Sequence, residues 1–505
     1  MKLDRSAGIL MHVTSLPSPF GIGDLGSEAQ LFADFLQRSN QTYWQILPLN
    51  PTEQGQGNSP YSAVSSRAGN TLLISPELLA ADGWLPQLDL SKYYLPKADK
   101  ADYKNAEKVK EQLFEIAWAT FQNSKDSGQQ SAFEAFCVKE NAWLLDFAFY
   151  TLLKDIHDGK PWFEWESGYK NREENLLSKL EISHAQELQK TKWLQFVFSI
   201  QWQKLKKYCN GKGISFFGDL PFYTSYDSVD VWSNRTLFKL DNDGQAIGVA
   251  GVPPDAFSSD GQLWGMPVFV WEIHKQQNYS WWIDRLKKNM EHFDLLRLDH
   301  FRAFADYWEV PAAAETAKSG EWKIGPKSDF FNAVKNALPT LPFIAEDLGD
   351  IDEPVYELRD EFQFAGMKVL QFAFGHEMPL SPHIPHNFTK NFVVYTGTHD
   401  NNTILGWYRH EAINHHHQLN HYTGQQIDET NIHHIMCRMA YASVADIAIL
   451  PVQDVLGLDE NARMNIPASP DNNWLWRLLP DQLNHGIENM LSDWTWLYNR
   501  RTSEQ

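Results

Sequence analysis

Three short apolar runs that each lead to an acidic residue constrain the fold of this chain more than any other feature. They are LLRL before Asp299, FIA before Glu346, and FVVYTG, which leads through Thr398 and His399 to Asp400. Apolar runs of this length are typical of strands buried on both faces of a parallel sheet. Parallel barrels and doubly wound sheets carry their sites at the carboxyl ends of their strands. We therefore expect the three carboxylates to lie in one site.

An arginine interrupts the first of these runs. Arg297 stands two residues before Asp299, so both side chains point to the same side of a strand. A buried guanidinium needs an anionic partner, which predicts a polar cavity shared by the two residues. We expect Arg297 to lower the pKa of Asp299 and keep it ionised, and burial to raise the pKa of Glu346. Taken alone, this pattern also fits a buried structural ion pair at the end of a strand.

Strand-like runs alternate with helix-like segments along the whole chain. The eight runs lie at 8–13, 43–52, 213–223, 294–299, 342–346, 367–374, 391–397 and 444–454. The first helical segment, 28–40, carries an apolar stripe that is expected to face the core. This stripe consists of Leu31, Phe32, Phe35 and Leu36. The alternation predicts an α/β protein with a (β/α)8 TIM barrel, and a doubly wound sheet is the alternative.

Two long segments are expected to be insertions in a single catalytic barrel that spans 1–505. Segment 96–190 is rich in Lys, Glu, Gln and Ala with apolar residues at helical spacing, which predicts a helical insertion subdomain. Segment 224–271 holds too much Gly, Pro and Ser for regular helix, but its many aromatic residues argue against disorder. It is expected to be a loop-rich insertion over the active site.

The composition excludes several classes of partner. Asp and Glu number 64 against 44 Lys and Arg, which argues against binding of nucleic acid or anionic membranes. The apolar run at 8–13 is too short for a signal sequence or a membrane span, so a cytoplasmic protein is expected. Three separated cysteines predict reduced thiols rather than a disulfide framework. No glycine-rich phosphate-binding motif is present, so no cofactor is expected, and the oligomeric state is left open.

Three converging carboxylates without metal-ligand spacing suit the chemistry of a glycosidic bond. Such a bond requires a nucleophile or base on one side of the anomeric carbon and a proton donor on the other. A third carboxylate stabilises the cationic transition state. The 20 tryptophans are consistent with stacking on sugar rings, although any one tryptophan is more often part of the core.

Four stretches resemble the signatures of a known enzyme family: GDLPFY, RLDHFR, AEDLG and YTGTHDNNT. They are similar to the motifs of α-amylase-type barrels, and in detail to the 4-α-glucanotransferases called amylomaltases, glycoside hydrolase family 77. The resemblance extends over nearly the whole chain, from RSAGILMHVTSLPSPF near the start to LPVQDVLGLDENARMNIPASPDNNWLWR near the end. It implies a barrel of the α-amylase type with large loop insertions.

The resemblance also implies roles for individual residues. Asp299 matches the nucleophile of a retaining transfer, Glu346 the acid/base, and Asp400 the carboxylate that stabilises the transition state. The two catalytic carboxyls of such a mechanism lie ~5–5.5 Å apart. The matching substrate-binding positions are Asp219, Arg297, His399, Tyr61 and Trp264. The implied partners are α-1,4-glucans such as maltooligosaccharides, glycogen or starch fragments, and no metal is implied.

Two positions near the site depart from the family pattern. Met266 stands in WGMP where asparagine is usual, which removes a polar side chain beside the site. Asn402 stands where aspartate is common. Neither departure affects the three catalytic positions.

Three other functions are weighed against glucan transfer. The nearest is hydrolysis of α-1,4-glucans, because water and a sugar hydroxyl can attack the same glycosyl-enzyme. A metal-dependent barrel enzyme would use Asp219, Asp299, Glu346 and His399 as ligands, but Arg297 is a poor neighbour for a cation. A non-catalytic glucan-binding protein would be expected to have lost a catalytic carboxylate.

The run His415–His417 lies in a polar stretch, which favours a solvated helix over a metal site.

Overall fold

The computed structural model describes residues 3–254, 259–469 and 471–501, and its central element is an eight-stranded parallel sheet. The strand order is β10-β11-β12-β1-β2-β3-β6-β9. A parallel bridge between Ile344 and Ala365 joins the two outer strands, so the sheet closes into a barrel. The strands are β1 Ser6–Leu10, β2 Tyr43–Gln45, β3 Ser215–Leu220, β6 Leu295–Leu298, β9 Phe343–Ala345, β10 Gly366–Val369, β11 Phe392–Tyr395 and β12 Ile447–Pro451. All eight predicted strands are confirmed, and the doubly wound alternative is wrong.

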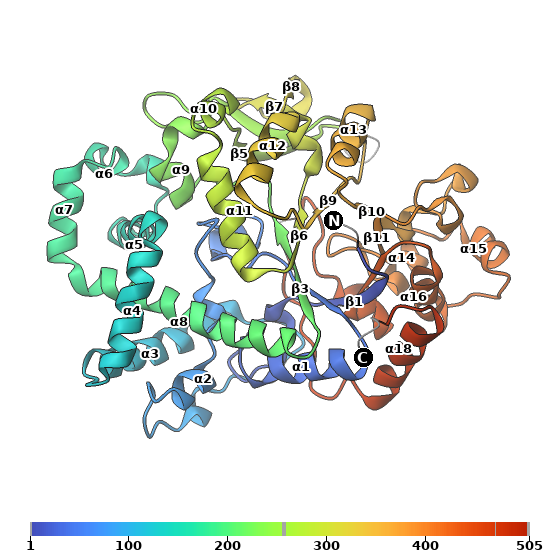
Figure 1. The fold of residues 1–505 in the computed structure, drawn as a ribbon, viewed down its shortest axis with the longest axis horizontal. Helices are drawn as coiled ribbons and strands as arrows, with labels where there is room; N and C mark the ends of the chain where they lie inside the picture. The colour runs from blue at the N-terminus through green and yellow to red at the C-terminus, as the bar shows by residue number, and fades with distance from the viewer. Residues whose placement is uncertain (1–2, 255–258, 470, 502–505) are drawn as a thin grey trace.

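Helices surround the barrel (Figure 1). They are α1 Ser27–Arg38, α2 Pro76–Ala81, α3 Tyr103–Gln122, α4 Ser127–Lys139, α5 Asn141–Ile156, α6 Ser167–Lys170, α7 Glu174–Ser183, α8 Ala185–Asn210, α9 Val229–Ser233, α10 Trp271–Gln276, α11 Ser280–His292, α12 Lys327–Ala337, α13 Glu353–Glu361, α14 Ile404–His410, α15 His416–Thr423, α16 Ile432–Ala442, α17 Val452–Val455 and α18 His485–Leu497. No helix among these described residues is long and apolar enough to cross a membrane.

The apolar stripe of α1 is narrower than the sequence predicts. Phe32, Phe35 and Leu36 are buried, but 56% of Leu31 is exposed. Leu31 was expected to face the core with the others, and this expectation is wrong. Its neighbour Phe32 points into the barrel wall, where its ring packs on Trp44 of β2 with 4.8 Å between centroids. Consecutive helical residues lie about 100° apart, so the edge of the stripe turns outward.

The two ends of the chain meet where the barrel closes. β1 pairs in parallel with β12, with Ser6 opposite Ile447. Arg500 is fully buried next to this junction and donates hydrogen bonds to the carbonyl oxygens of Ser6, Tyr441 and Asp446. Because a buried guanidinium has five N–H groups to satisfy, these carbonyls fix the C-terminal segment against the first strand.

Segment 96–190 contains α3 to α7 and the first residues of α8. These helices lie to one side of the barrel, at the left of Figure 1. Lys110 of α3 is fully buried and donates to the carbonyl oxygens of Leu72 at 2.6 Å and Ile74 at 2.9 Å, with Asp24 at 3.4 Å. α8 continues beyond residue 190 and packs against α1 and β3. That this segment forms a subdomain of its own stays a prediction.

Segment 224–271 contains more regular structure than a loop. It supplies β4 Gly248–Val252 and β5 Gln262–Pro267 to a four-stranded antiparallel sheet, while residues 255–258 lie outside the described part of the chain. The order of this sheet is β5-β4-β7-β8, with β7 Asp306–Pro311 and β8 Glu321–Ile324. The sheet lies at the top of Figure 1. The sequence did not predict it, because β4 pairs with a strand that comes after β6 in the chain.

Candidate active site

The structure brings the predicted acidic residues to one end of the barrel. Asp299 and Glu346 directly follow β6 and β9, which are hydrogen-bonded neighbours. Asp219 lies near the end of β3, on the other side of β6, and Asp400 lies in the loop after β11. All four carboxylates therefore lie at the carboxyl ends of parallel strands, as predicted.

Arg297 connects two of these carboxylates. Its Nη1 lies 2.7 and 2.8 Å from the two carboxylate oxygens of Asp219, and its Nη2 lies 2.8 Å from Oδ1 of Asp299. Arg297 is 4% exposed and Asp219 is 1% exposed, whereas the Asp299 side chain keeps 27% of its surface open. The expected pair is present, and Asp299 is the partner that faces the open side.

Aromatic residues extend this network. Tyr61 donates its hydroxyl hydrogen to Oδ2 of Asp219 at 2.7 Å. Its ring stacks on the imidazole of His399 with 5.0 Å between centroids, and both rings lie within 6.0 Å of Trp474. Nε2 of His399 in turn lies 3.3 Å from Oδ2 of Asp400. Tyr61, Asp219, His399 and Asp400 thus form one connected group, and Trp474 is a member that the sequence did not single out.

Backbone N–H groups orient the carboxylate of Glu346. Oε2 accepts a hydrogen bond from the N–H of His300 at 2.8 Å, and Oε1 accepts from the N–H of Leu348 at 3.1 Å. His300 has φ 49° and ψ 49°, a left-handed conformation that is costly for a residue with a side chain. This conformation turns the chain directly after Asp299, so the residue that follows one carboxylate binds the other.

Trp264 contacts the same histidine. Its ring lies 5.0 Å from the imidazole of His300, at 79° to it, and 6.1 Å from the ring of Tyr223. Trp264 belongs to β5, so the antiparallel sheet reaches the active site through this residue. Met266 lies two residues further along β5 and is partly buried.

Asp400 is held by a segment that the sequence reading did not identify as functional. Oδ1 of Asp400 accepts a hydrogen bond from the side-chain amide of Asn465 at 2.6 Å, and its backbone carbonyl accepts from Arg463 at 2.7 Å. Both residues lie in the family-like stretch DENARMNIP. They come 63 and 65 residues after Asp400 in sequence, beyond β12, so no local pattern connects them with it.

The pKa values of the two central carboxyls do not divide as expected. Burial raises the pKa of Asp299 to about 8; Arg297 opposes this shift, while Asp219, Glu346 and Asp400 add to it. Burial also raises the pKa of Glu346. The expectation that Arg297 keeps the pKa of Asp299 low is wrong, because burial and the charges of the neighbouring carboxylates together outweigh the opposing effect of Arg297. Both shifts favour the protonated form of these carboxyls.

The described residues contain no group of three or more His, Cys, Asp or Glu side chains arranged to hold a metal ion. In the histidine-rich stretch, His416 stacks on the ring of Tyr408 with 3.9 Å between centroids. His417 and His421 are exposed one turn apart on α15, with their ring centroids 4.1 Å apart. The expected helix is present, and its histidines pack on rings.

The comparisons with known proteins agree with this geometry. A model of glycoside hydrolase family 77, described as 4-alpha-glucanotransferase, matches residues 11–482. The 4-alpha-glucanotransferase of Synechocystis sp. is 45% identical over 98% of both chains, and that of Aquifex aeolicus is 44% identical over 94% of this chain and 96% of its own.

Solved structures give the same result. An amylomaltase from Streptococcus agalactiae in complex with acarbose superposes with a TM-score of 0.94 at 37% identity, covering 99% of this chain and all of that one. An amylomaltase from Corynebacterium glutamicum, 16% identical over 99% of this chain and 75% of its own, shares the fold with a TM-score of 0.78. The resemblance inferred from the sequence motifs is confirmed. This chain belongs to glycoside hydrolase family 77, the 4-alpha-glucanotransferases, and is an enzyme of that activity.

Proposed function

We propose that the enzyme transfers α-1,4-glucan segments by a retaining mechanism with a covalent glycosyl-enzyme on Asp299. One observation carries this proposal: Asp299, Glu346 and Asp400 lie at the carboxyl ends of the barrel strands around the buried Arg297–Asp219 pair. In the first step the carboxylate of Asp299 bonds to the anomeric carbon while the glycosidic bond breaks. The proton of Glu346 passes to the departing glycosidic oxygen.

In the second step an acceptor 4-hydroxyl attacks the same carbon. Glu346 takes the hydroxyl proton, the new glycosidic bond forms, and the bond to Asp299 breaks. Each step inverts the configuration at the anomeric carbon, so the product has the same anomeric configuration as the donor. Both carboxyls are restored, so the reaction needs no further reactant.

The charge of the site supports these roles. Four carboxylates and a single guanidinium act on one another in this site, so a developing positive charge on the sugar ring is stabilised. Because the pKa of both Asp299 and Glu346 is raised, these carboxyls favour holding the one proton that the first step consumes. We assign this proton to Glu346 when substrate is bound, because the cationic centre then lies against Asp299. Asp400, fixed by Asn465, is the third carboxylate that stabilises the transition state.

The substrates of the proposed reaction are maltooligosaccharides and fragments of glycogen or starch. The amylomaltase with 37% identity binds acarbose, a molecule related to such glucans, which supports this class of ligand. Tyr61, His399, Asp219 and Arg297 are proposed to hold the donor sugar, and Trp264 to stack on the glucan path. A cytoplasmic location is proposed as well, consistent with three unpaired cysteines among the described residues.

Hydrolysis of the same glucans is the second candidate reaction. Transfer is favoured where the acceptor side excludes water. We propose that segment 224–271, whose strands β4 and β5 bring Trp264 to His300, covers this side. Water would then compete poorly with an acceptor glucan.

Incubation with maltotriose alone tests the proposal, with the products separated by size. A ladder of longer glucans together with glucose, insensitive to a chelator and absent in Asp299→Asn, is the expected result. Products that are all shorter than maltotriose would establish hydrolysis instead. Loss of activity with the chelator would favour a metal-dependent reaction.

A further inference from the structure

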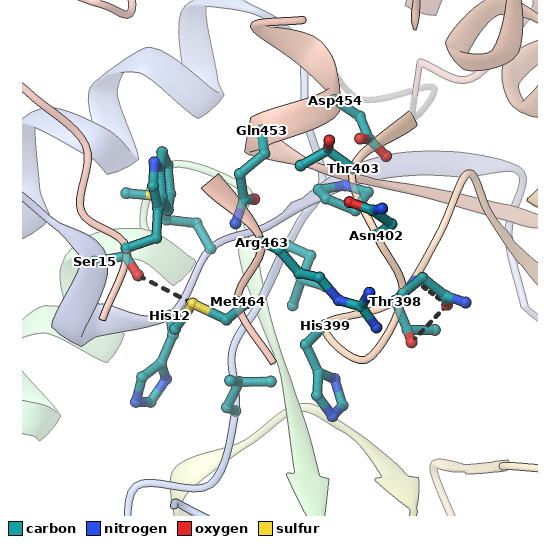
Figure 2. Close-up of a pocket in the computed structure, with 16 residues that line it drawn as sticks. His12, Ser15, Thr398, His399, Asn402, Thr403, Gln453, Asp454, Arg463 and Met464 are labelled. Atoms are coloured by element: carbon teal, nitrogen blue, oxygen red, sulfur yellow. Dashed lines mark hydrogen bonds between the residues drawn. The ribbon is translucent and has the colours of Figure 1, made fainter. Parts of the chain in front are cut away.

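A small cavity beside His399 has no role in the mechanism above. It lies between the ends of β1, β11 and β12, has a volume of about 30 Å³, and is shown in Figure 2. That volume accommodates about two water-sized groups. Its polar lining residues include His12, Asn402, Arg463 and Asp454.

His12 has an unusual environment for a buried histidine. It follows β1, is 8% exposed, and its Nδ1 has no hydrogen-bond partner among the described residues. Burial, assisted by nearby His399, lowers the pKa of His12 to about 3, so the ring is neutral at working pH. A neutral imidazole has one N–H donor and one bare nitrogen acceptor. Leaving such a group unpaired is costly, so a bound group or a water molecule is expected to complete its bonding.

Asn402 lines the same cavity. Its Nδ2 donates to Glu411 at 3.0 Å, and its Oδ1 is buried without a hydrogen-bond partner among the described residues. This oxygen lies close to Gly406, where an added Cβ would come within 2.4 Å of it. It therefore packs against α14.

A comparison within the chain separates this site from ordinary burial. His274 of α10 is 1% exposed, and neither of its ring nitrogens has a partner among the described residues. It packs against the rings of Phe269 and Trp271, each with 5.3 Å between centroids, and lines no cavity beside the active site. Buried neutral histidines thus occur in this fold as packing residues, and His12 differs in facing an open space next to a substrate-binding residue.

We propose that His12 is a substrate-binding residue, whose imidazole hydrogen-bonds a hydroxyl of the donor glucan that enters the cavity beside His399. This inference rests on the proposed function, which supplies the glucan. A hydroxyl donates one hydrogen bond and accepts others, so it matches the donor and the acceptor nitrogen of a neutral imidazole. A hydroxyl or hydroxymethyl group also fits the size of the cavity. His12 binds and orients the sugar and transfers no proton.

Steady-state kinetics with maltotriose test this assignment in His12→Leu, with His274→Leu as the matched control. Loss of one such hydrogen bond is expected to raise KM about tenfold with kcat within about twofold, because the bond is equally present in the ground and transition states. His12→Asn keeps a donor and an acceptor near the position of Nδ1 and is expected to restore part of the loss. His274→Leu should leave KM unchanged.

Calorimetric titration in the Asp299→Asn background measures binding without turnover. Maltotriose should bind about tenfold more weakly when His12→Leu is added, and with intermediate affinity for His12→Asn. Equal affinities with and without His12 would overturn the inference and leave the cavity to bound water. Failure of the wild-type enzyme to elongate maltotriose would instead overturn the proposed function, so the two results are distinguishable.

Discussion

Burial and the neighbouring carboxylates raise the pKa of Asp299 while Arg297 lowers it, and the net shift affects the stability of the fold. The pKa of this carboxyl is raised to about 8 in the folded protein, against about 4 in an unfolded chain. Between these values the unfolded chain has lost a proton that the folded protein keeps. The contribution of Asp299 to stability is therefore fully present below pH 4 and is lost as the pH rises towards 8.

Asp299→Asn should accordingly be more stable than the wild type at high pH. Asparagine cannot ionise, and Arg297 keeps its pair with Asp219. We expect the Tm of the variant to exceed that of the wild type by about 2–5 °C at pH 8, and by much less at pH 5. Differential scanning calorimetry at both pH values measures this difference. A Tm difference that does not grow with pH would contradict the raised pKa.

Glu346 is expected to act through its proton, which a change of leaving group can test. Glu346→Gln keeps a side chain of the same shape but cannot donate a proton, so transfer from maltotriose should fall about 10²–10⁴-fold. A maltosyl fluoride donor needs no proton at its leaving group. Fluoride release by the variant should therefore remain close to that of the wild type in the first turnover. Equal losses with both donors would assign Glu346 a role other than proton donor.

Among the elements, the loop that connects β11 to α14 carries two residues of the candidate active site. It carries His399 and Asp400, and both of its ends are fixed by one buried residue. Asp454 accepts a hydrogen bond from the hydroxyl of Thr396 at 2.5 Å and from the N–H of Ile404 at 2.8 Å. Asp454 is 2% exposed, and burial raises its pKa to about 6.

Asp454→Ala is expected to loosen this loop. The change leaves the Thr396 hydroxyl and the Ile404 N–H without an acceptor, which costs about 1–3 kcal/mol for each unsatisfied group. Because Asp400 is then less well positioned, kcat should fall about tenfold or more. In Asp454→Asn the amide oxygen can still accept from the Ile404 N–H, and the amide N–H can donate to the Thr396 hydroxyl oxygen. This variant should therefore retain most of the activity. Equal kcat for wild type and Asp454→Ala would show that the loop is held by Arg463 and Asn465 alone.

Elements with local signals could be predicted from the sequence, and elements with distant partners could not. β6, β9 and β11 were predicted because each is a buried apolar run that leads to a carboxylate. The residues of β4 and β5 were expected to form a loop, because the strands that complete their sheet come more than 50 residues after β4 begins. Tyr61 and His399, whose rings stack, lie 338 positions apart in the chain. That both belong to one site follows from the family resemblance and not from any local pattern.

The same distinction applies to the site. The positions of Asp299, Glu346 and Asp400 could be predicted because strand ends converge in a barrel. The raised pKa of Asp299 could not, because it depends on how deeply this carboxyl is buried and on how many other carboxylates lie near it. Asn465 and His12 reach the site from segments whose own sequence carries no catalytic signal.

At the scale of the whole molecule, Lys110 links the helices of segment 96–190 to the loops of the barrel. Its ammonium group is fully buried between Asp24 and two backbone carbonyls. Lys110→Met leaves Asp24 without its cation and both carbonyls without this donor, which should reduce the free energy of unfolding by about 3–5 kcal/mol. Lys108→Met, on the exposed side of the same helix, is the control. Chemical denaturation of both variants checks this, and similar midpoints would argue against the link.

The closure of the barrel has a consequence for synthesis of the chain. β1 needs β12 as its neighbour, and Arg500 bonds the carbonyl of Ser6. The first strand therefore stays without one of its two partners until β12, about 440 residues later in the chain, has left the ribosome. At about 5–20 residues per second, this wait lasts roughly half a minute or more. During that time the apolar edge of β1 is exposed to other nascent chains. Chaperones are therefore expected to bind mainly the segment that contains β1.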